Sequence, residues 1–152
     1  MNLRSYFFLT LCCISLNCLG QIDKKDFPFD WRNNEIEAHL STGNDFELFT
    51  PSDEDIILSK KLSNIYIDSL SRTSKNQILR YSMSKYYRQY VGYFDNNGDK
   101  IILINAFCSK EGSSEYLTKK WVMILDGGSC YFKIKINLNK RTCFDLLING
   151  EA

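Results

Sequence analysis

The sequence predicts an α+β fold in which one helix packs on an antiparallel sheet. Two observations support this prediction. Residues 53–70 carry an apolar stripe with helical spacing, and from residue 86 onward segments rich in aromatic and β-branched residues alternate with turn-forming pairs. The expected architecture is a helix from Asp53 to Leu70 on a four-stranded antiparallel meander sheet, within a domain of residues 50–152.

The helix is predicted from its start signals and its periodicity. Thr50 can cap it, Pro51 suits its first position, and Asp53 completes a capping box. The acidic residues that follow favour the positive end of the helix dipole, so a metal or acid–base site is not needed to explain them. The apolar stripe, which should face the sheet, consists of Leu58, Leu62, Ile65, Tyr66 and Leu70.

The strands are predicted from runs between turn signals. A hairpin joins Tyr86–Phe94 to Ile101–Cys108 through Asn97-Gly98, a pair typical of type I′ turns. Strand character follows in Lys120–Leu125, Cys130–Leu138 and Thr142–Ile148, so the sequence offers five candidate segments for the four-stranded meander. A helix followed by a meander is similar to the cystatin-like and nuclear-transport-factor-like shapes, a likeness of element order that implies no activity.

The first twenty residues are typical of a signal peptide. Arg4 precedes the apolar run Tyr6–Leu16, and Cys18-Leu19-Gly20 offers small residues for cleavage before Gln21. The run is shorter than the roughly 20 residues that a membrane-spanning helix needs, so no integral membrane segment is expected in the mature chain. The sequence therefore predicts export to the periplasm or beyond.

A lipid anchor on Cys18 is the alternative, although Leu16 and Asn17 occupy positions where that signal prefers small residues. After the predicted cleavage at Gly20, the mature chain begins with a poorly defined N-terminal segment, residues 21–49. Strand candidates in this segment are Glu35–Leu40 and Asp45–Phe49.

Length and charge narrow the class of protein. The chain has 152 residues, which fits one domain, and 44% of them are hydrophobic, enough for a core. The chain has nineteen lysine and arginine residues and eighteen aspartate and glutamate residues. This balance disfavours nucleic acid as a partner, because binding a polyanion through bulk electrostatics needs excess positive charge.

The positions of the cysteines predict the thiol state. Three of the six cysteines lie in the leader or at its edge, which leaves Cys108, Cys130 and Cys143. In a flat meander Cys108 and Cys143 are three strand spacings apart, about 14 Å, whereas a disulfide tolerates about 7 Å between Cα atoms. Free buried thiols are therefore expected.

The predicted register sorts side chains onto two faces of the sheet. One face is apolar and includes Val91, Tyr93 and Ile104, so it should receive the helix. The other interleaves aromatic and basic side chains, a composition found where proteins bind glycans or partner proteins. The candidate ligand-binding residues on that face are Arg88, Tyr90, Trp121, Lys133 and Lys135.

A solvent-exposed sheet face covered by long amphipathic side chains would have the same composition without any ligand. A slip of one residue in the register would also exchange the two faces.

Catalytic and cofactor signatures are weak. Asp95–Asp99 resembles a calcium loop, but its glycine falls at the fourth position, so a turn is expected. Asp126-Gly127-Gly128 joins two strands, unlike a phosphate loop, and the single histidine, His39, rules out usual zinc spacings. No metal or other cofactor is expected.

The C-terminal half resembles small exported proteins of unknown function from Bacteroidota. The resemblance is carried by Trp121–Phe132, Ile134–Leu138 and Phe144–Gly150, and it extends over about residues 50–152. It implies export and an α+β domain, and it assigns no residue a catalytic role.

Together these observations favour an exported, non-catalytic binding protein for a cell-envelope glycan or a partner protein. The alternative is a small secreted hydrolase, which would need His39 beside a carboxylate and a serine.

Overall fold

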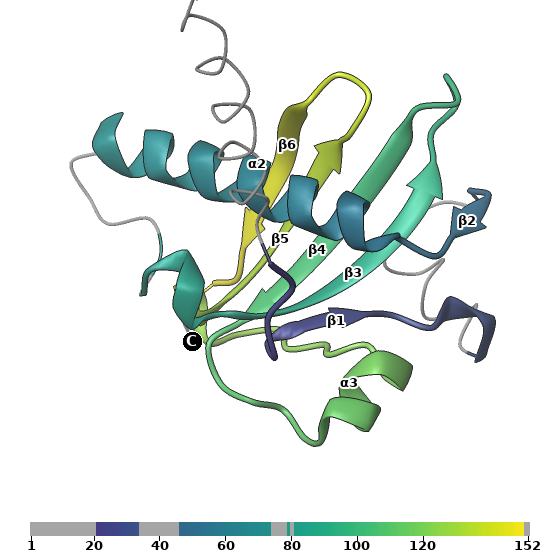
Figure 1. Ribbon diagram of the computed structural model, residues 1–152. Coiled ribbons are helices and arrows are strands. Elements are labelled where there is room, and N and C mark those ends of the chain that lie inside the picture. Colours follow the sequence, from purple (N-terminus) through teal and green to yellow (C-terminus); the bar gives the residue numbers. More distant parts are fainter. Residues whose placement is uncertain (1–20, 34–45, 74–78, 80, 151–152) are drawn as a thin grey trace, which may run out of the picture.

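The protein has one long helix on a mixed sheet, which confirms the α+β class (Figure 1). The computed structural model describes residues 21–33, 46–73, 79 and 81–150. The predicted signal peptide, Cys18, the candidate strand Glu35–Leu40 and His39 lie outside the described residues, so the predictions about them stay predictions. The elements are β1 (Asp26–Pro28), β2 (Leu48–Phe49), α2 (Asp53–Thr73), β3 (Tyr87–Phe94), β4 (Lys100–Phe107), α3 (Ser114–Lys119), β5 (Tyr131–Asn137) and β6 (Thr142–Ile148), with 3₁₀ turns at Trp31–Asn33, Met83–Lys85 and Gly128–Cys130.

The sheet follows the order β1-β3-β4-β5-β6, and β2 also pairs with β3. Strands β3 to β6 are antiparallel neighbours in chain order. Strand β1, however, is parallel to β3, so the sheet is mixed and has six strands. The four-stranded antiparallel prediction therefore matches β3 to β6 and omits β1 and β2, which the N-terminal segment adds beside β3.

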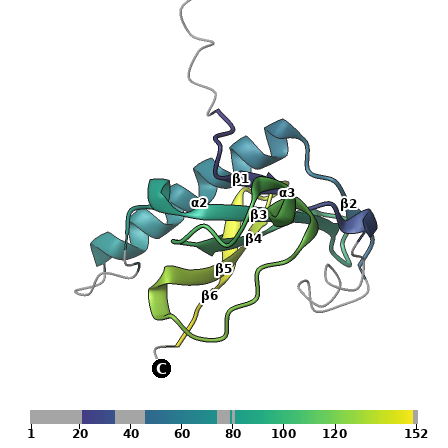
Figure 2. The same cartoon turned by 90° about the horizontal axis from the view of Figure 1, so that it is seen from below.

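One predicted strand is wrong. Residues 120–125 do not form a strand, and β4 pairs directly with β5. The segment instead runs over the face of the sheet opposite α2, as the view from below shows (Figure 2). Its continuous apolar run, Trp121–Leu125, favoured a strand, but in the structure Trp121 and Val122 are buried whereas Met123 and Leu125 are exposed.

Helix α2 is capped two residues later than predicted. Ser52 Oγ accepts a hydrogen bond from Asp55 N (3.2 Å), and the Asp55 carboxylate accepts one from Ser52 N (3.1 Å), so the capping box is Ser52 to Asp55. The helix continues to Thr73, three residues past the predicted end. Its buried line is Ile56, Ser59, Ser63 and Ile67, whereas Ile65 of the predicted stripe is 58% exposed.

The first hairpin forms where predicted, but its register differs by one residue. The structure pairs Tyr90 with Ile104 and Val91 with Leu103, whereas a turn centred between Asn97 and Gly98 would pair Val91 with Ile104. Because side chains alternate along a strand, this slip moves every β3 side chain to the other face.

Both faces of the sheet are covered. The cluster between α2 and the sheet contains Tyr90, Ile104, Phe132 and Ile134. The opposite face carries Val91, Leu103 and Phe107, which are packed under Phe29, Trp121 and other residues of the N-terminal segment and of the connection between α3 and β5. Helix and connection thus lie on opposite sides of the sheet (Figure 2).

Candidate functional site

The five residues predicted to bind ligand lie on two different faces. Tyr90 and Arg88 point toward α2 and are fully buried, which corrects their predicted position on the open face. Their displacement follows from the one-residue register slip in β3. Trp121, Lys133 and Lys135 lie on the opposite face, as predicted.

Arg88 and Tyr90 belong to a buried charge cluster. Asp26 is fully buried and lies 2.9 Å from Arg88 Nε and 2.7 Å from Lys60 Nζ, and it accepts a hydrogen bond of 2.8 Å from the Tyr90 hydroxyl. Burial raises the pKa of Tyr90 well above its usual value, so the phenol stays a proton donor. This cluster fastens β1 to α2 and β3, a structural role that leaves neither side chain on the surface.

Asp23 extends this cluster to the surface. Its carboxylate lies 2.8 Å from Lys60 Nζ and 3.3 Å from Arg88 Nη2. Partial burial by itself raises the pKa of Asp23, but the hydrogen bonds from Lys60 and from the Lys25 amide, with the neighbouring positive charges, outweigh it and lower the pKa below the usual value. The ionised carboxylate is thus the form that the folded protein favours.

The two lysines on β5 differ in their surroundings. Lys135 lies 3.1 Å from the Asp145 carboxylate on β6. Lys133 is partly buried between Asn105 and Leu147 on the neighbouring strands, and burial lowers its pKa. They therefore form a narrow basic strip and lack the broad aromatic platform that the sequence predicted around them.

An open groove of about 470 Å³ lies beside Trp121. It is enclosed by the loop after β4, by α3 and by the segment that follows α3. Its lining residues are Glu111, Gly112, Ser113, Tyr116, Trp121, Val122, Met123 and Ile124. Of the five residues predicted to bind ligand, only Trp121 lines this groove.

Helix α3 forms one wall of the groove. Ser113 caps this helix by accepting a hydrogen bond of 3.1 Å from Tyr116 N. Gly112 precedes the cap with φ of 110°, a left-handed conformation that favours glycine, and a Cβ there would come within 3.0 Å of the Tyr116 ring. The loop therefore needs glycine at this position for Tyr116 to pack against it.

Two buried amides hold the opposite wall. Gln89 donates from Nε2 to the Leu117 and Lys120 carbonyls (2.7 and 2.6 Å) and accepts from Val122 N (2.9 Å). Asn105 donates to the Val122 carbonyl (2.8 Å) and to Gln89 Oε1 (3.1 Å). These side chains supply the hydrogen bonds that strand pairing would otherwise give to residues 120–122.

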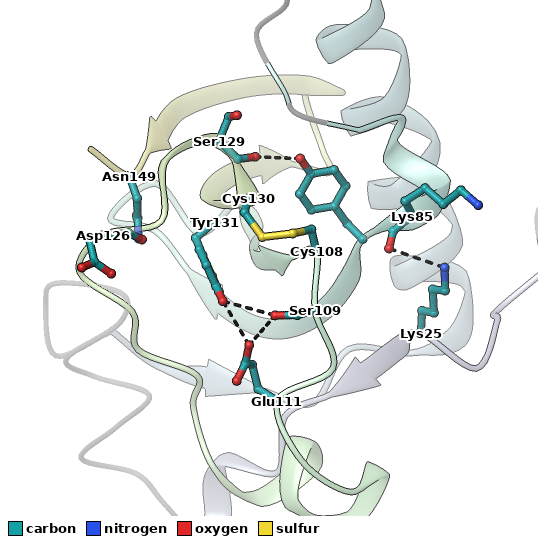
Figure 3. The surroundings of a disulfide bond; sticks show 11 residues. Lys25, Lys85, Cys108, Ser109, Glu111, Asp126, Ser129, Cys130, Tyr131 and Asn149 are labelled. Carbon is teal, nitrogen blue, oxygen red and sulfur yellow. Dashed lines mark hydrogen bonds between the residues drawn. A yellow bond between two sulfur atoms is a disulfide. The ribbon is translucent and has the colours of Figure 1, made fainter. Parts of the chain in front are cut away.

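A disulfide closes the chain around the groove. Cys108 and Cys130 are bonded with their Cα atoms 5.1 Å apart, so the prediction of free thiols at these positions is wrong (Figure 3). They face each other because β4 pairs directly with β5 and the hydrogen bond from Cys108 N to the Cys130 carbonyl (3.0 Å) continues that ladder. Of the cysteines in the described residues, Cys143 alone is free, and burial raises its pKa to about 11.

The disulfide lies next to a hydroxyl–carboxylate cluster (Figure 3). Glu111 Oε1 accepts hydrogen bonds from Ser109 Oγ and from the Tyr131 hydroxyl (3.0 Å), and the two hydroxyl oxygens are 3.2 Å apart. Both bonds end on Oε1. Among the described residues the second carboxylate oxygen of Glu111 accepts no hydrogen bond, and Glu111 is one of the residues that line the groove.

The exposed surface of the groove is aromatic and apolar. Tyr116 is 49% exposed and Met123 62% exposed, whereas Trp121 is only 7% exposed because it packs edge-on against Phe29 at 5.5 Å. Trp121 therefore forms the floor and Tyr116 offers the open ring. No signal in the sequence identified Tyr116 or Glu111, because neither lies in a predicted helix or strand.

The groove offers hydrogen bonding and stacking, and the hydroxyl of Ser113, which also lines it, accepts the capping hydrogen bond of α3. Across residues 21–33, 46–73, 79 and 81–150, no cluster of three or more histidine, cysteine, aspartate or glutamate side chains could hold a metal ion. A second hollow of about 430 Å³ lies at the first hairpin turn, with Glu47 and Asp95 among its lining. It has no exposed aromatic residue to match Tyr116.

Comparison with protein-family models found no match, and comparison with curated proteins and with solved structures found none either. No helix of the described residues is long and apolar enough to cross a membrane.

Proposed function

We propose that this protein is an exported, non-catalytic binding module that holds a cell-envelope glycan in the groove beside α3. The observation that carries the proposal is that one groove is lined by the exposed Tyr116 ring, by the Glu111 carboxylate and by apolar side chains. Ligand sites commonly combine apolar walls with a few oriented polar groups in this way.

The groove chemistry suits a neutral sugar. An aromatic ring covers the apolar face of a pyranose, and a carboxylate oxygen accepts hydrogen bonds from vicinal hydroxyls. Glu111 is already oriented by Ser109 and Tyr131, so a ligand would not have to order it. The Cys108–Cys130 disulfide supports the export part of the proposal, because such bonds persist in oxidising compartments.

A partner protein is the second candidate ligand. Met123 is 62% exposed, Leu125 89% and Leu147 64%, and exposed apolar residues of this kind are favoured at protein interfaces. Asn149 Nδ2 donates to the Asp126 carbonyl (3.1 Å), which places the segment of Leu125 beside the end of β6. A Leu125→Asp variant that loses capture of a host protein but keeps glycan binding would favour this candidate.

The glycan proposal is tested by replacing Tyr116 with alanine. Loss of one stacked ring should weaken binding to cell-envelope glycan fragments by about 1–3 kcal/mol, measured by calorimetry or on a glycan array. The melting temperature should stay close to that of the wild type, because half of the side chain is already exposed.

Tyr81→Ala is the matched control, since Tyr81 is 45% exposed and does not line the groove. Equal affinity of the wild type and the Tyr116→Ala variant for every glycan bound would rule out the groove as the glycan site.

A further inference from the structure

The groove beside α3 carries a negative charge. Among the described residues that line it, Glu111 is the only charged side chain, and the others are glycine, serine, aromatic or apolar residues. Lys110 and Lys120 are close in sequence, but they do not belong to that lining. The Lys119 ammonium lies 2.7 Å from the Glu115 carboxylate, outside the groove. The groove therefore favours a ligand group of positive charge.

The contacts of Glu111 do not neutralise its charge. Oε1 accepts hydrogen bonds from the Ser109 and Tyr131 hydroxyls, and both donors are uncharged. Within residues 21–33, 46–73, 79 and 81–150, Glu111 forms no ion pair, and its Oε2 accepts no hydrogen bond. Because Glu111 is partly buried, solvent screens its charge less than that of a fully exposed carboxylate.

An aromatic ring lies close to this carboxylate. Gly112 follows Glu111 in the chain, and a Cβ on Gly112 would come within 3.0 Å of the Tyr116 ring, so this ring packs on the backbone beside Glu111. The Tyr116 side chain is 49% exposed. The face of an aromatic ring attracts cations because its quadrupole is negative there. Ring and carboxylate together favour a cationic group carried on an apolar frame.

We propose that the groove prefers, among glycans, an amino sugar with a free ammonium group, which pairs with Glu111 while the sugar ring packs on Tyr116. This inference rests on the glycan-binding function proposed above and narrows its ligand class. An ammonium group has three N–H donors and can give one of them to Glu111 Oε2, in a bond that charge strengthens.

Other sugars lack this interaction. A neutral sugar can still stack on Tyr116, but an N-acetyl group on the same nitrogen removes the positive charge and leaves one N–H donor. A uronic acid would bring a like charge toward Glu111, which disfavours it. The carboxylate therefore ranks amino sugars above neutral sugars and neutral sugars above acidic ones.

Two oligosaccharides that differ only in acetylation test the proposal. The affinity of the processed protein for the linear trimers of glucosamine and of N-acetylglucosamine is measured by calorimetry at about pH 6, below the usual pKa range of amines. In low salt the wild type should bind the glucosamine trimer about fivefold more tightly, or better. At about 1 M salt the difference should shrink to about twofold, because salt screens the ion pair.

Glu111→Gln removes the charge and keeps the size of the side chain. It should weaken binding of the glucosamine trimer about fivefold more than binding of the N-acetylated trimer, a comparison that isolates the contribution of charge. Glu115→Gln is the matched control, because Glu115 is an exposed glutamate of α3 that does not line the groove. This variant should keep the wild-type preference. Thermal melting checks that both variants are folded.

Three results would overturn the preference for amino sugars. The wild type may not bind the N-acetylated trimer as tightly as the glucosamine trimer, and the preference must not survive in a folded Glu111→Gln variant. Trilysine bound as tightly as the glucosamine trimer would mean that the groove recognises charge without the sugar. A protein that binds other cell-envelope fragments but neither trimer would also contradict the preference, whereas a protein that binds no glycan at all would contradict the proposed function itself.

Discussion

At the scale of single residues, the fold around the groove depends on two buried amides that hydropathy patterns do not reveal. Gln89 and Asn105 bond to the backbone of the Leu117–Val122 stretch and to each other. In the sequence both residues interrupt apolar strands and look like surface positions. Their role could not be predicted, because it depends on which backbone segment lies over the sheet.

Replacing Gln89 with leucine should destabilise the protein by about 2–4 kcal/mol. The Leu117 and Lys120 carbonyls and Val122 N would be buried without these partners, and each such group costs about 1–3 kcal/mol when it stays dry. Urea unfolding gives the loss, and Trp121 emission should shift to longer wavelength as the segment loosens. A Gln89→Leu variant as stable as the wild type would show that residues 120–122 do not need these bonds.

The lowered pKa of Asp23 predicts that folding stability depends on pH. Its pKa is lower in the folded protein than the unfolded value of about 3.9, so its contribution to stability is present above about pH 4 and is lost as the pH falls through the folded value. The stability difference between wild type and Asp23→Asn should therefore be largest at neutral pH and shrink toward about pH 3. Urea unfolding at each pH measures it.

Asp126→Asn serves as the control for this series, because the Asp126 side chain is exposed and makes no ion pair within the described residues. A difference between wild type and Asp23→Asn that does not change with pH would mean that the Lys60 and Arg88 contacts contribute nothing to folding stability.

At the scale of elements, the sequence predicted the existence of α2 and of β3 to β6. It did not predict the cap of the helix or the register of the strands correctly. The helix could be predicted because its periodicity and its acidic start are local signals, although Ser52 and not Thr50 is the cap. The predicted hairpin register is wrong by one residue because a turn sequence fixes its centre only approximately. Because of this one-residue difference in register, Arg88 and Tyr90 lie in the core and not on the predicted binding face.

The disulfide is the element-scale feature with the clearest test. Thiol titration of unfolded, unreduced protein should find one free thiol among Cys108, Cys130 and Cys143. Reduction should destabilise the protein by about 3 kcal/mol, the scale expected for a closed loop of this length, measured by thermal melting with and without reductant. Three free thiols would contradict the Cys108–Cys130 disulfide and agree with the prediction made from the sequence.

At the scale of the whole molecule, the sheet is buried on both faces. A prediction that assigns side chains to one buried face and one open face could therefore identify only part of the proposed site. The prediction left one face open to ligand, whereas Phe29, Trp121 and the α3 connection cover much of it. The covering segments come from residues 26–31 and 114–124, which lack strong periodicity. The aromatic residues of the predicted open face are therefore mostly core, and the proposed binding surface, with Tyr116 and Glu111, lies at the rim of the covering layer.

The most direct test of the binding proposal is an NMR titration of the ¹⁵N-labelled protein with cell-envelope glycan fragments. We expect the amide shifts of residues 111–116 and 121–124 to change together with the indole N–H of Trp121, while the amides of α2 and of the first hairpin turn stay fixed. Changes confined to the hairpin turn, or to the Lys133–Lys135 strip of β5, would contradict the assignment of the groove as the glycan site.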